Sequence, residues 1–278
     1  MMINPFSNPQ RVFFLPHRRG DTEAHFPGLR ASAAKKTAAA PYLLSLGCLF
    51  ALFFACTGGK RDIRAYYFPV DDLRDGKVYA YTALEGDTTD RRYCYYRTIL
   101  PDSGQFLVST QYDRYFGIVQ ILREKIVDNG SLARQTTLYE TDTASVQSHP
   151  VEAAIESPNL FPFRVTDSLG VFLFGLRYHP SDDTAATIYL IRNRRYLGDG
   201  PEFAFGGEKY ATVRFGLREV IGHSKEGSSE FEGTGEEWYA KGLGLVYFSK
   251  SFSEGNIRYA FRLSEIFPMA ELERRARQ

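Results

Sequence analysis

The chain has 278 residues, of which 44% are hydrophobic and 15% aromatic, and its formal net charge is +1. This length allows one large domain or two small ones with a proper core. The aromatic content suits β-strands, because aromatic side chains pack well on a pleated surface. Charges of both signs are mixed along the chain beyond residue 56, which excludes the basic footprint of a nucleic-acid-binding protein.

An uncharged apolar stretch lies in the N-terminal part of the chain. No residue from Thr37 to Gly59 is charged, and Lys35 and Lys36 stand immediately before this stretch. Its apolar core covers residues 42–55, and a helix of about 14 residues spans roughly 21 Å, short of the ~30 Å hydrocarbon core of a membrane. The pattern predicts a secretory signal. A membrane span lengthened by residues 38–40 is the alternative.

The end of this stretch, Leu52-Phe53-Phe54-Ala55-Cys56, resembles a lipobox, the site where lipoprotein signal peptidase cuts before a lipid-modified cysteine. The family prefers Leu three places before the cysteine; this chain has Phe53 there and Leu52 one place further out. The resemblance implies cleavage before Cys56 and lipidation of its thiol. Cys48 is a rival site, but too few apolar residues precede it to form a signal core.

The resemblance and the pattern of the remaining sequence together predict a layout of four parts. Residues 1–36 are an N-terminal extension, either disordered or ahead of the true start, and residues 37–55 are the apolar signal region. Residues 56–64 hold the lipidated cysteine and a flexible tether. Residues 65–278 form a single β-rich domain with a candidate seam near 148–168. Because the tether lacks acidic sorting signals, we expect the anchor to lie in the outer membrane, on its periplasmic face.

Cysteine usage agrees with this location. Cleavage removes Cys48 and lipidation occupies Cys56, so Cys94 is the one thiol left and the mature chain has no internal disulfide. Cys94 stands in an aromatic segment, Tyr93-Cys94-Tyr95-Tyr96, which predicts a buried and inert thiol.

Short predicted strands follow one another beyond Arg64, separated by Gly and Asp clusters. Asp128-Asn129-Gly130 predicts a hairpin, because Asn-Gly accepts positive φ. Residues 222–230 are predicted to be a mobile hairpin loop, and Pro268 can open a closing helix that runs through Arg277. The predicted strands are 77–83, 92–99, 105–110, 116–122, 124–127, 135–140, 170–178, 186–192, 210–216, 237–240, 243–248 and 257–263.

No amphipathic helices of 10–15 residues alternate with these strands, which argues against a parallel α/β sheet. The sequence predicts a mainly β fold: a curved antiparallel sheet or partly closed barrel with a short C-terminal helix. A transmembrane barrel is the competing geometry. It requires lipid-facing positions that stay apolar in strands of about ten residues. Charges such as Arg97, Arg123 and Arg214 interrupt the predicted strands and disfavour it.

The closing segment Glu237–Val246 is similar to the end of a group of uncharacterised Gram-negative envelope lipoproteins and periplasmic proteins with a curved antiparallel sheet. Their shape resembles the Lol-type carriers, which hold acyl chains inside an unclosed barrel. The resemblance implies a non-enzymatic envelope lipoprotein that binds an apolar or amphipathic ligand, such as a lipid, or docks to another envelope protein.

No catalytic residue, metal site or cofactor site is predicted. The histidines beyond Cys56 are His149, His179 and His223, and none has metal-ligand spacing with another ligand. His179 with Asp182 and Asp183 is the nearest approach to a cluster, and such Asp-rich loops are usually solvated turns.

Other motifs are equally weak. Gly222–Gly227 resembles a nucleophile elbow with one residue too many, and the neighbours Glu236 and Glu237 point apart on a strand. The basic patch of Arg192, Arg194 and Arg195 is interpreted as the protected edge of a sheet, with contact to anionic lipid head groups as the alternative.

Two functions therefore remain open: a non-enzymatic binding or docking protein, which the sequence favours, and a periplasmic hydrolase with an unrecognised site. An empty aromatic cavity would support ligand binding, whereas a completely filled interior would leave docking. Candidate lining residues, each of which has packed core as its alternative, are Tyr79, Tyr81, Tyr95, Phe106, Phe172, Phe174, Tyr247, Tyr259 and Phe261.

Overall fold

The computed structural model describes residues 60–278 apart from 86, 88, 142–146, 167–169, 226 and 253–256. The signal region, Cys48 and the predicted lipidation site Cys56 lie outside the described residues, so these predictions stay predictions. Among the helices that the structure describes, none is long and apolar enough to cross a membrane.

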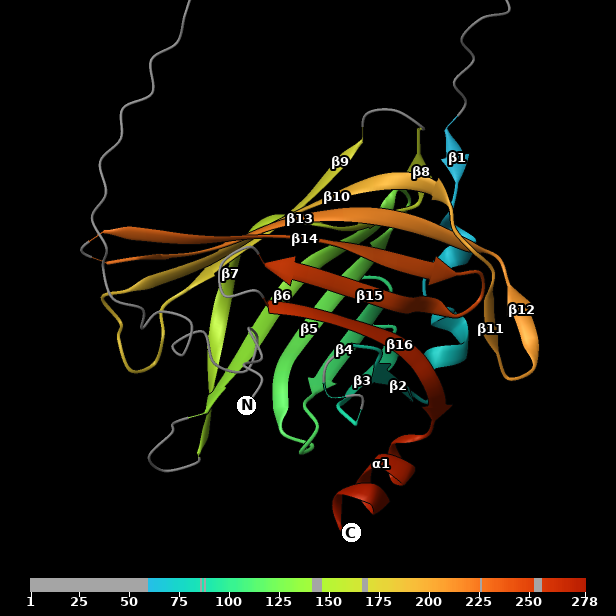
Figure 1. The fold of residues 1–278 in the computed structure, drawn as a ribbon, viewed down its shortest axis with the longest axis horizontal. Coiled ribbons are helices and arrows are strands. Elements are labelled where there is room, and N and C mark those ends of the chain that lie inside the picture. The colour runs from blue at the N-terminus through green and yellow to red at the C-terminus, as the bar shows by residue number, and fades with distance from the viewer. Residues whose placement is uncertain are drawn as a thin grey trace, which may run out of the picture.

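The body of the protein is a barrel of antiparallel strands (Figure 1). In chain order the barrel strands are β2 (Lys77–Ala83), β3 (Arg91–Ile99), β4 (Phe106–Tyr112), β5 (Ile118–Val127), β6 (Gly130–Thr141), β7 (Ser148–Pro162), β9 (Val171–Tyr178), β10 (Thr187–Asp199), β13 (Thr212–Ser224), β14 (Ser228–Ala240), β15 (Gly244–Phe252) and β16 (Ile257–Phe267).

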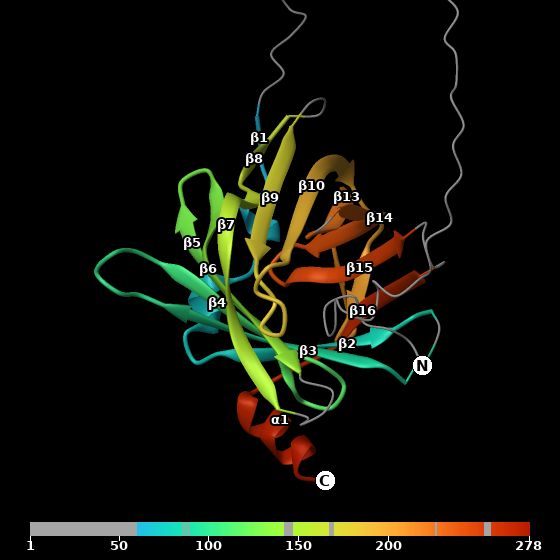
Figure 2. The same ribbon diagram turned by 90° about the vertical axis from the view of Figure 1, so that its left-hand side faces the viewer.

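Around the barrel the order is β10-β13-β14-β15-β16-β2-β3-β4-β5-β6-β7-β9, and the pairing of β9 with β10 closes the ring. The prediction of a mainly β fold with a short C-terminal helix is confirmed, and the closure is complete. Closure has a physical benefit, because a closed barrel leaves no unpaired strand edge. Figure 2 shows the strands arranged around a common interior.

The smaller elements lie at the ends and on the outside of the barrel. Two short strand pairs, β1 with β8 and β11 with β12, extend the barrel at one end. Helix α1 begins after Pro268, as the sequence predicts. Their bounds are β1 (Arg61–Asp62), the 3-10 helices η3 (Arg64–Tyr66) and η4 (Val70–Leu73), β8 (Arg164–Val165), β11 (Phe203–Phe205), β12 (Glu208–Tyr210) and α1 (Met269–Ala276).

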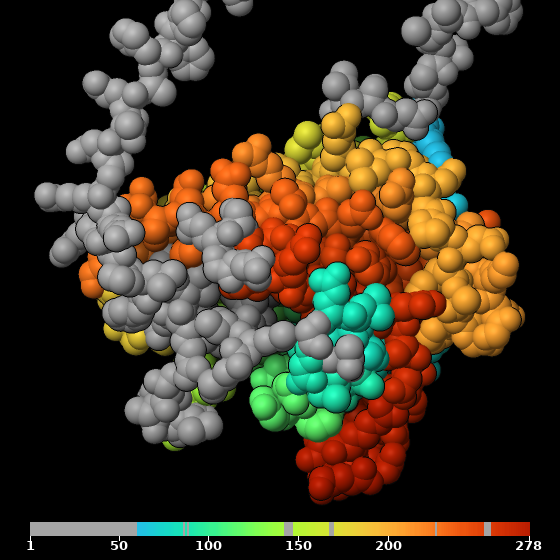
Figure 3. Space-filling model, in the orientation of Figure 1, coloured from blue at the N-terminus to red at the C-terminus, as the bar shows by residue number. Residues whose placement is uncertain are grey.

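Helix α1 packs on the outer face of β2 and projects from the body in the space-filling view (Figure 3). Its Leu272 is 3% exposed and belongs to a small outer core with Val78, Ala80 and Tyr93. Helix α1 therefore covers the outward residues of β2, which explains why the sequence of this strand is apolar on both faces.

The predicted hairpin at Asp128-Asn129 is confirmed, since Val127 pairs with Gly130 across it. The stretch named as a candidate seam near 148–168 contains β7, a strand of 15 residues. Pro150 is tolerated there because this part of β7 pairs only with β6, and Pro158 follows a register shift in the pairing with β9. A strand tolerates proline where no ladder hydrogen bond is needed, so both prolines fit within β7.

The predicted loop at residues 222–230 is also mostly strand. β13 and β14 continue as a paired ribbon until Ser224 meets Ser228. Figure 1 shows this ribbon running out past the rest of the barrel wall. Its side chains are polar because they are exposed there, while the backbone hydrogen bonds still define strands.

One end of the barrel is closed by residues 61–73, here called the plug. Ile63 and Leu73 are fully buried, and Tyr67 and Phe68 nearly so. The Ile63 amide donates to the Phe163 carbonyl at 2.8 Å. The sequence assigned residues 61–64 to the flexible tether, but they are part of the body, because β1 pairs with β8 and Ile63 packs inside.

Candidate functional site

Strand β10 crosses the barrel wall from its open end to the plug and shows how the interior is organised. Its inward residues are, in order, Ile188, Leu190, Arg192, Arg194 and Tyr196, because successive side chains alternate between the two faces of a strand. The interior therefore has an apolar layer, then a charged layer, then an aromatic layer next to the plug.

The sequence suggested that these arginines protect the edge of a sheet, but they do not lie on an edge strand. β10 pairs with β9 on one side and β13 on the other. Arg195 points outward and is exposed, whereas Arg194 is only 5% exposed. The interpretation of an edge strand is wrong, because barrel closure gives this strand a neighbour on both sides.

The aromatic layer forms the floor of the interior. The Phe161 ring lies 4.8 Å from Tyr239, 5.3 Å from Tyr67 and 5.4 Å from Phe215, measured between centroids. Such tilted and edge-on contacts add to the free energy gained from burial. The floor is thus closely packed, and the plug seals it from outside.

The charged layer contains a buried ion pair between β10 and β14. Arg194 donates from Nε to Oε2 of Glu237 at 2.8 Å and from Nη2 to Oε1 at 3.2 Å, and the Tyr239 hydroxyl donates to Oε2 at 3.0 Å. Burial by itself would raise the pKa of Glu237, but the attraction of Arg194 outweighs it and keeps this pKa below the usual range. Arg194 Nη1 is also buried and has no hydrogen-bond partner.

A second buried group joins β10, β13 and β15. Glu219, which is 1% exposed, accepts from Arg192 Nε at 2.5 Å and from Lys250 Nζ at 2.7 Å. Against the effect of burial, the two cations lower the pKa of Glu219 to about 2. The pKa of Lys250 also falls, to about 8, because burial and repulsion from Arg192 outweigh the attraction of Glu219.

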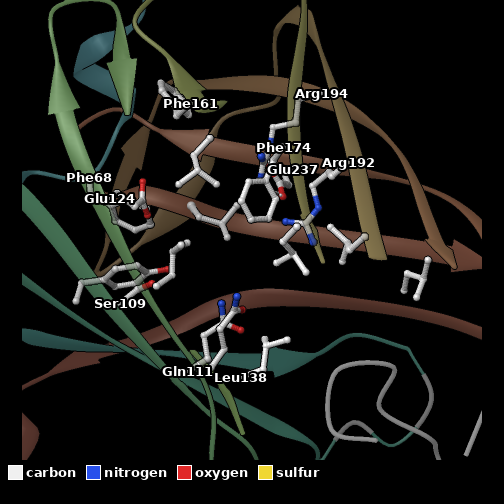
Figure 4. A pocket seen from close by; sticks show the side chains of 18 of the residues that line it. Phe68, Ser109, Gln111, Glu124, Leu138, Phe161, Phe174, Arg192, Arg194 and Glu237 are labelled. Carbon is white, nitrogen blue, oxygen red and sulfur yellow. Dashed lines mark hydrogen bonds and ion pairs between the residues drawn. The ribbon is translucent and has the colours of Figure 1, made fainter. Parts of the chain in front are cut away.

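A third acid, Glu124 on β5, lies on the wall opposite Arg192 and Arg194 (Figure 4). It accepts a hydrogen bond from the Tyr67 hydroxyl of the plug at 2.7 Å. Burial raises the pKa of Glu124, and the bond from Tyr67 and the charge of Arg194 offset this only in part.

A cavity of about 180 Å³ lies against this charged layer (Figure 4). Arg192, Arg194, Glu124 and Glu237 line it on the side of the plug. Much of the rest of its wall is apolar and includes Leu122, Leu160, Phe174, Leu176, Ile188 and Leu190, which belong to one buried cluster. The interior of the barrel is therefore not completely filled.

A second cavity of about 170 Å³ adjoins the first. Arg192, Glu237, Gln111 and Gln120 line both cavities. Other residues of the second wall are Tyr81, Cys94, Leu245, Lys250, Tyr259 and Phe261. Members of the charged layer thus line both spaces, which are of similar size.

The first cavity reaches partly exposed residues at the end of the barrel away from the plug, here called the mouth. Leu138, Glu140 and Ile221 line the cavity and are only half-buried. The loop between β9 and β10 is fastened there, because the Ser181 amide and hydroxyl donate to Glu140 Oε2 at 2.8 and 2.9 Å.

No protein-family model matches the chain, and no curated protein sequence matches it significantly. Among solved structures, it is similar to a protein described as a "putative lipoprotein" from Parabacteroides distasonis, at 12% identity over 72% of this chain and 97% of that one, with a TM-score of 0.44. It is also similar to a "putative exported protein with YmcC-like fold" from Bacteroides fragilis, at 13% identity over 68% of this chain and 94% of that one, with a TM-score of 0.43.

The structure brings only some of the candidate lining residues to the cavities. Phe174 lines the first cavity, and Tyr81, Tyr259 and Phe261 line the second. Phe172 lines a separate pocket beside residues 129–132. These five lie on β2, β9 and β16.

The other four candidates lie elsewhere. Tyr79 is 1% exposed and packs against Phe68 and Tyr96 in the core. Tyr95 is part of the outer core under α1. Phe106 is covered by the Arg123 side chain, 4.2 Å from its ring centroid, and Tyr247 stacks on Trp238 at 4.4 Å.

His179 lies outside the charged layer, and the Cys94 thiol is inert. His179 Nδ1 lies 2.8 Å from the Ala186 carbonyl oxygen. In the described part of the chain, no group of three His, Cys, Asp or Glu residues is arranged to hold a metal ion. Cys94 points into the barrel, and burial raises the pKa of its thiol to about 12, so the thiolate is scarce at neutral pH.

Sequence reasoning missed the charged layer itself. Its members are Glu124, Arg192, Arg194, Glu219, Glu237 and Lys250. A signal was present on β10, where Arg192 and Arg194 occupy the same alternating positions as Ile188, Leu190 and Tyr196. Charges on the apolar face of a strand indicate a polar interior, and this period-2 pattern was the available clue.

Proposed function

We propose that this protein binds an amphipathic small molecule inside the barrel and is a non-enzymatic lipoprotein of the cell envelope. The observation that carries the proposal is the cavity of about 180 Å³ with an apolar wall on one side and buried cations on the other. An interior built only for stability would be filled by side chains. An apolar wall with a few polar groups is the usual composition of a ligand site.

The charges of the layer favour binding over hydrolysis. Glu219 and Glu237 are held in ion pairs that lower their pKa, so neither carries a proton to donate at neutral pH. The described residues that line the two cavities include no histidine to act as a base. A hydrolase would need a nucleophile and a base within reach of each other in the same space.

We expect an apolar naphthalene-type fluorescent probe to bind the purified protein, with emission that rises as the probe leaves water. Leu138→Trp should weaken this binding by about tenfold or more, because Leu138 lines the cavity at the half-buried mouth and an indole ring would fill the space. Fluorescence titration measures both affinities.

The matched control is Leu197→Trp on the same sheet. Leu197 is 42% exposed on β10, so an indole ring there should leave probe binding unchanged. Equal probe affinity in both variants and the parent chain would contradict a site in the barrel. Absence of any probe binding would leave docking to another envelope protein as the role.

The membrane anchor rests on the sequence and is tested separately. We expect intact-mass spectrometry of the protein from its native envelope to show a chain that begins at Cys56 and carries acyl groups. The short apolar core and the small Ala55 before Cys56 support this expectation. Cys56→Ser should leave the segment uncleaved and unacylated, and Cys48→Ser should not. An unmodified chain that begins upstream of Cys56 would contradict the lipoprotein proposal, including its place at the periplasmic face of the outer membrane.

A further inference from the structure

The charges within the barrel are not matched one to one. Among the described residues of the charged layer, Arg192, Arg194 and Lys250 are cations, and Glu219 and Glu237 are the acids that pair with them. Glu124 is the remaining acid, and its hydrogen bond comes from the neutral Tyr67 hydroxyl. Burial raises the pKa of Glu124, and of the three acids it is the one that no ion pair joins to a cation of the layer.

Arg194 has a donor that the protein itself does not use. Its guanidinium binds Glu237 through Nε and Nη2, which leaves Nη1 buried without a hydrogen-bond partner. A buried N–H group without a partner is costly, so such groups are rare in folded proteins. Arg194 lines the first cavity and is 5% exposed, and Arg192 lines the same cavity beside it.

The order of side chains sets the direction in which a ligand fits. From the mouth towards the plug, β10 presents Leu190, then Arg192, then Arg194. Leu190 is flanked by Leu176 on β9 and Ile221 on β13, which are apolar as well. Beyond Arg194 the floor is occupied by packed aromatic rings. A hydrocarbon chain therefore has room on the mouth side of the arginines, and a polar head group fits against them.

We propose that the barrel binds a free fatty acid of medium chain length, with its carboxylate on Arg194 and Arg192 and its hydrocarbon chain towards the mouth. This inference rests on the proposed binding function. Arginine suits the role, because its planar guanidinium matches the geometry of a carboxylate. An apolar cavity of about 150 Å³ holds one benzene molecule, so a cavity of about 180 Å³ accommodates part of an alkyl chain whose remainder extends through the mouth.

The test compares three ligands that share an eight-carbon chain: octanoate, 1-octanol and octyl phosphate. Isothermal titration of the purified full chain should show that octanoate binds roughly ten- to one-hundred-fold more tightly than 1-octanol, the usual gain from a charged hydrogen bond. Octyl phosphate should bind more weakly than octanoate, because its second charge lacks a partner. Tighter binding of octyl phosphate would overturn the carboxylate in favour of a phosphate head group.

Arg194→Lys is the variant that isolates the head group. A lysine keeps a positive charge opposite Glu237 but lacks Nη1 and the planar fork. We expect the preference for octanoate over 1-octanol to fall to within about threefold, because the variant loses more affinity for the carboxylate than for the neutral hydroxyl. Equal affinity of the parent chain for octanoate and 1-octanol would overturn the head-group assignment and leave the binding function standing. No binding of any ligand or of the apolar probe would overturn both.

A measurement on the parent chain does not depend on how a variant folds. Octanoate labelled with ¹³C at its carboxyl carbon reports its own ionisation by NMR. Next to Arg194 and Arg192, the bound carboxyl should have a pKa below that of free octanoate, because the cations favour its charged form. A bound signal that titrates as the free acid does would overturn the proposal.

Discussion

Replacement of Glu219 by Gln should destabilise the protein by about 3–5 kcal/mol, one of the largest effects of any single polar substitution in the barrel. Glu219 is 1% exposed and accepts bonds from both Arg192 and Lys250. A neutral amide leaves two buried cations without a counter-charge. Urea unfolding at pH 7 measures the loss in the free energy of unfolding.

The loss from Glu219→Gln should depend on pH. The folded-state pKa of Glu219 is about 2, below its ordinary value of 4.5, so its contribution is fully present above pH 4.5 and disappears as the pH falls towards 2. This shift corresponds to roughly 3 kcal/mol. The difference in stability between the parent chain and the variant should therefore shrink across this acid window.

Glu232→Gln is the matched control for Glu219→Gln. Glu232 lies on the neighbouring strand β14 and pairs with Arg218 at 2.9 Å, but both side chains are more than half exposed. An exposed pair contributes little, so this control should change stability by less than about 0.5 kcal/mol. Equal losses for the buried and exposed glutamates would contradict the importance of the charged layer.

Replacement of Phe215 by Ala should cost about 3–5 kcal/mol, for a different physical reason. Phe215 is fully buried in the aromatic floor, with its ring 5.4 Å from Phe161 and 5.7 Å from both Tyr196 and Tyr239. The variant loses the transfer free energy of the ring and leaves a cavity that the closed barrel cannot collapse. Phe215→Leu should lose less, because it retains part of the volume.

Two comparisons distinguish this packing effect from an electrostatic one. The loss from Phe215→Ala should stay constant between pH 2 and pH 5, whereas that from Glu219→Gln should not. Tyr115→Ala removes an aromatic ring that is 77% exposed and should cost less than about 0.5 kcal/mol. A loss below about 1 kcal/mol for Phe215→Ala would mean that the floor is loosely packed.

The aromatic floor and the charged layer contribute differently to the stability of the barrel. The aromatic floor and the plug supply stability through close packing. Burying the charged layer costs desolvation free energy, so its ion pairs add little net stability to the protein. Four residues of the layer line the cavity of about 180 Å³, where the proposed ligand would meet their charges.

Local sequence determined most of the strands, the turn chemistry and the closing helix. In the predicted strand 257–263, Tyr259, Phe261 and Leu263 alternate with Arg258 and Arg262, and the barrel places the apolar side chains inside and both arginines outside. Asp128-Asn129-Gly130 predicted the position of its hairpin because turn residues act locally, but Asn129 does not adopt the positive φ expected of it. Such features depend on neighbours along the chain and need no knowledge of the fold.

Only the tertiary structure decided which polar residues meet. Arg194 and Glu237 are 43 positions apart, and Glu219 and Lys250 are 31 apart. Strand order, register and closure bring them together, and none of these is encoded in a local pattern. The same closure turned a predicted edge strand into a wall with arginines inside. Burial then converts those arginines from ordinary surface charges into the candidate ligand site, because their partners and solvent exposure are set by the whole barrel.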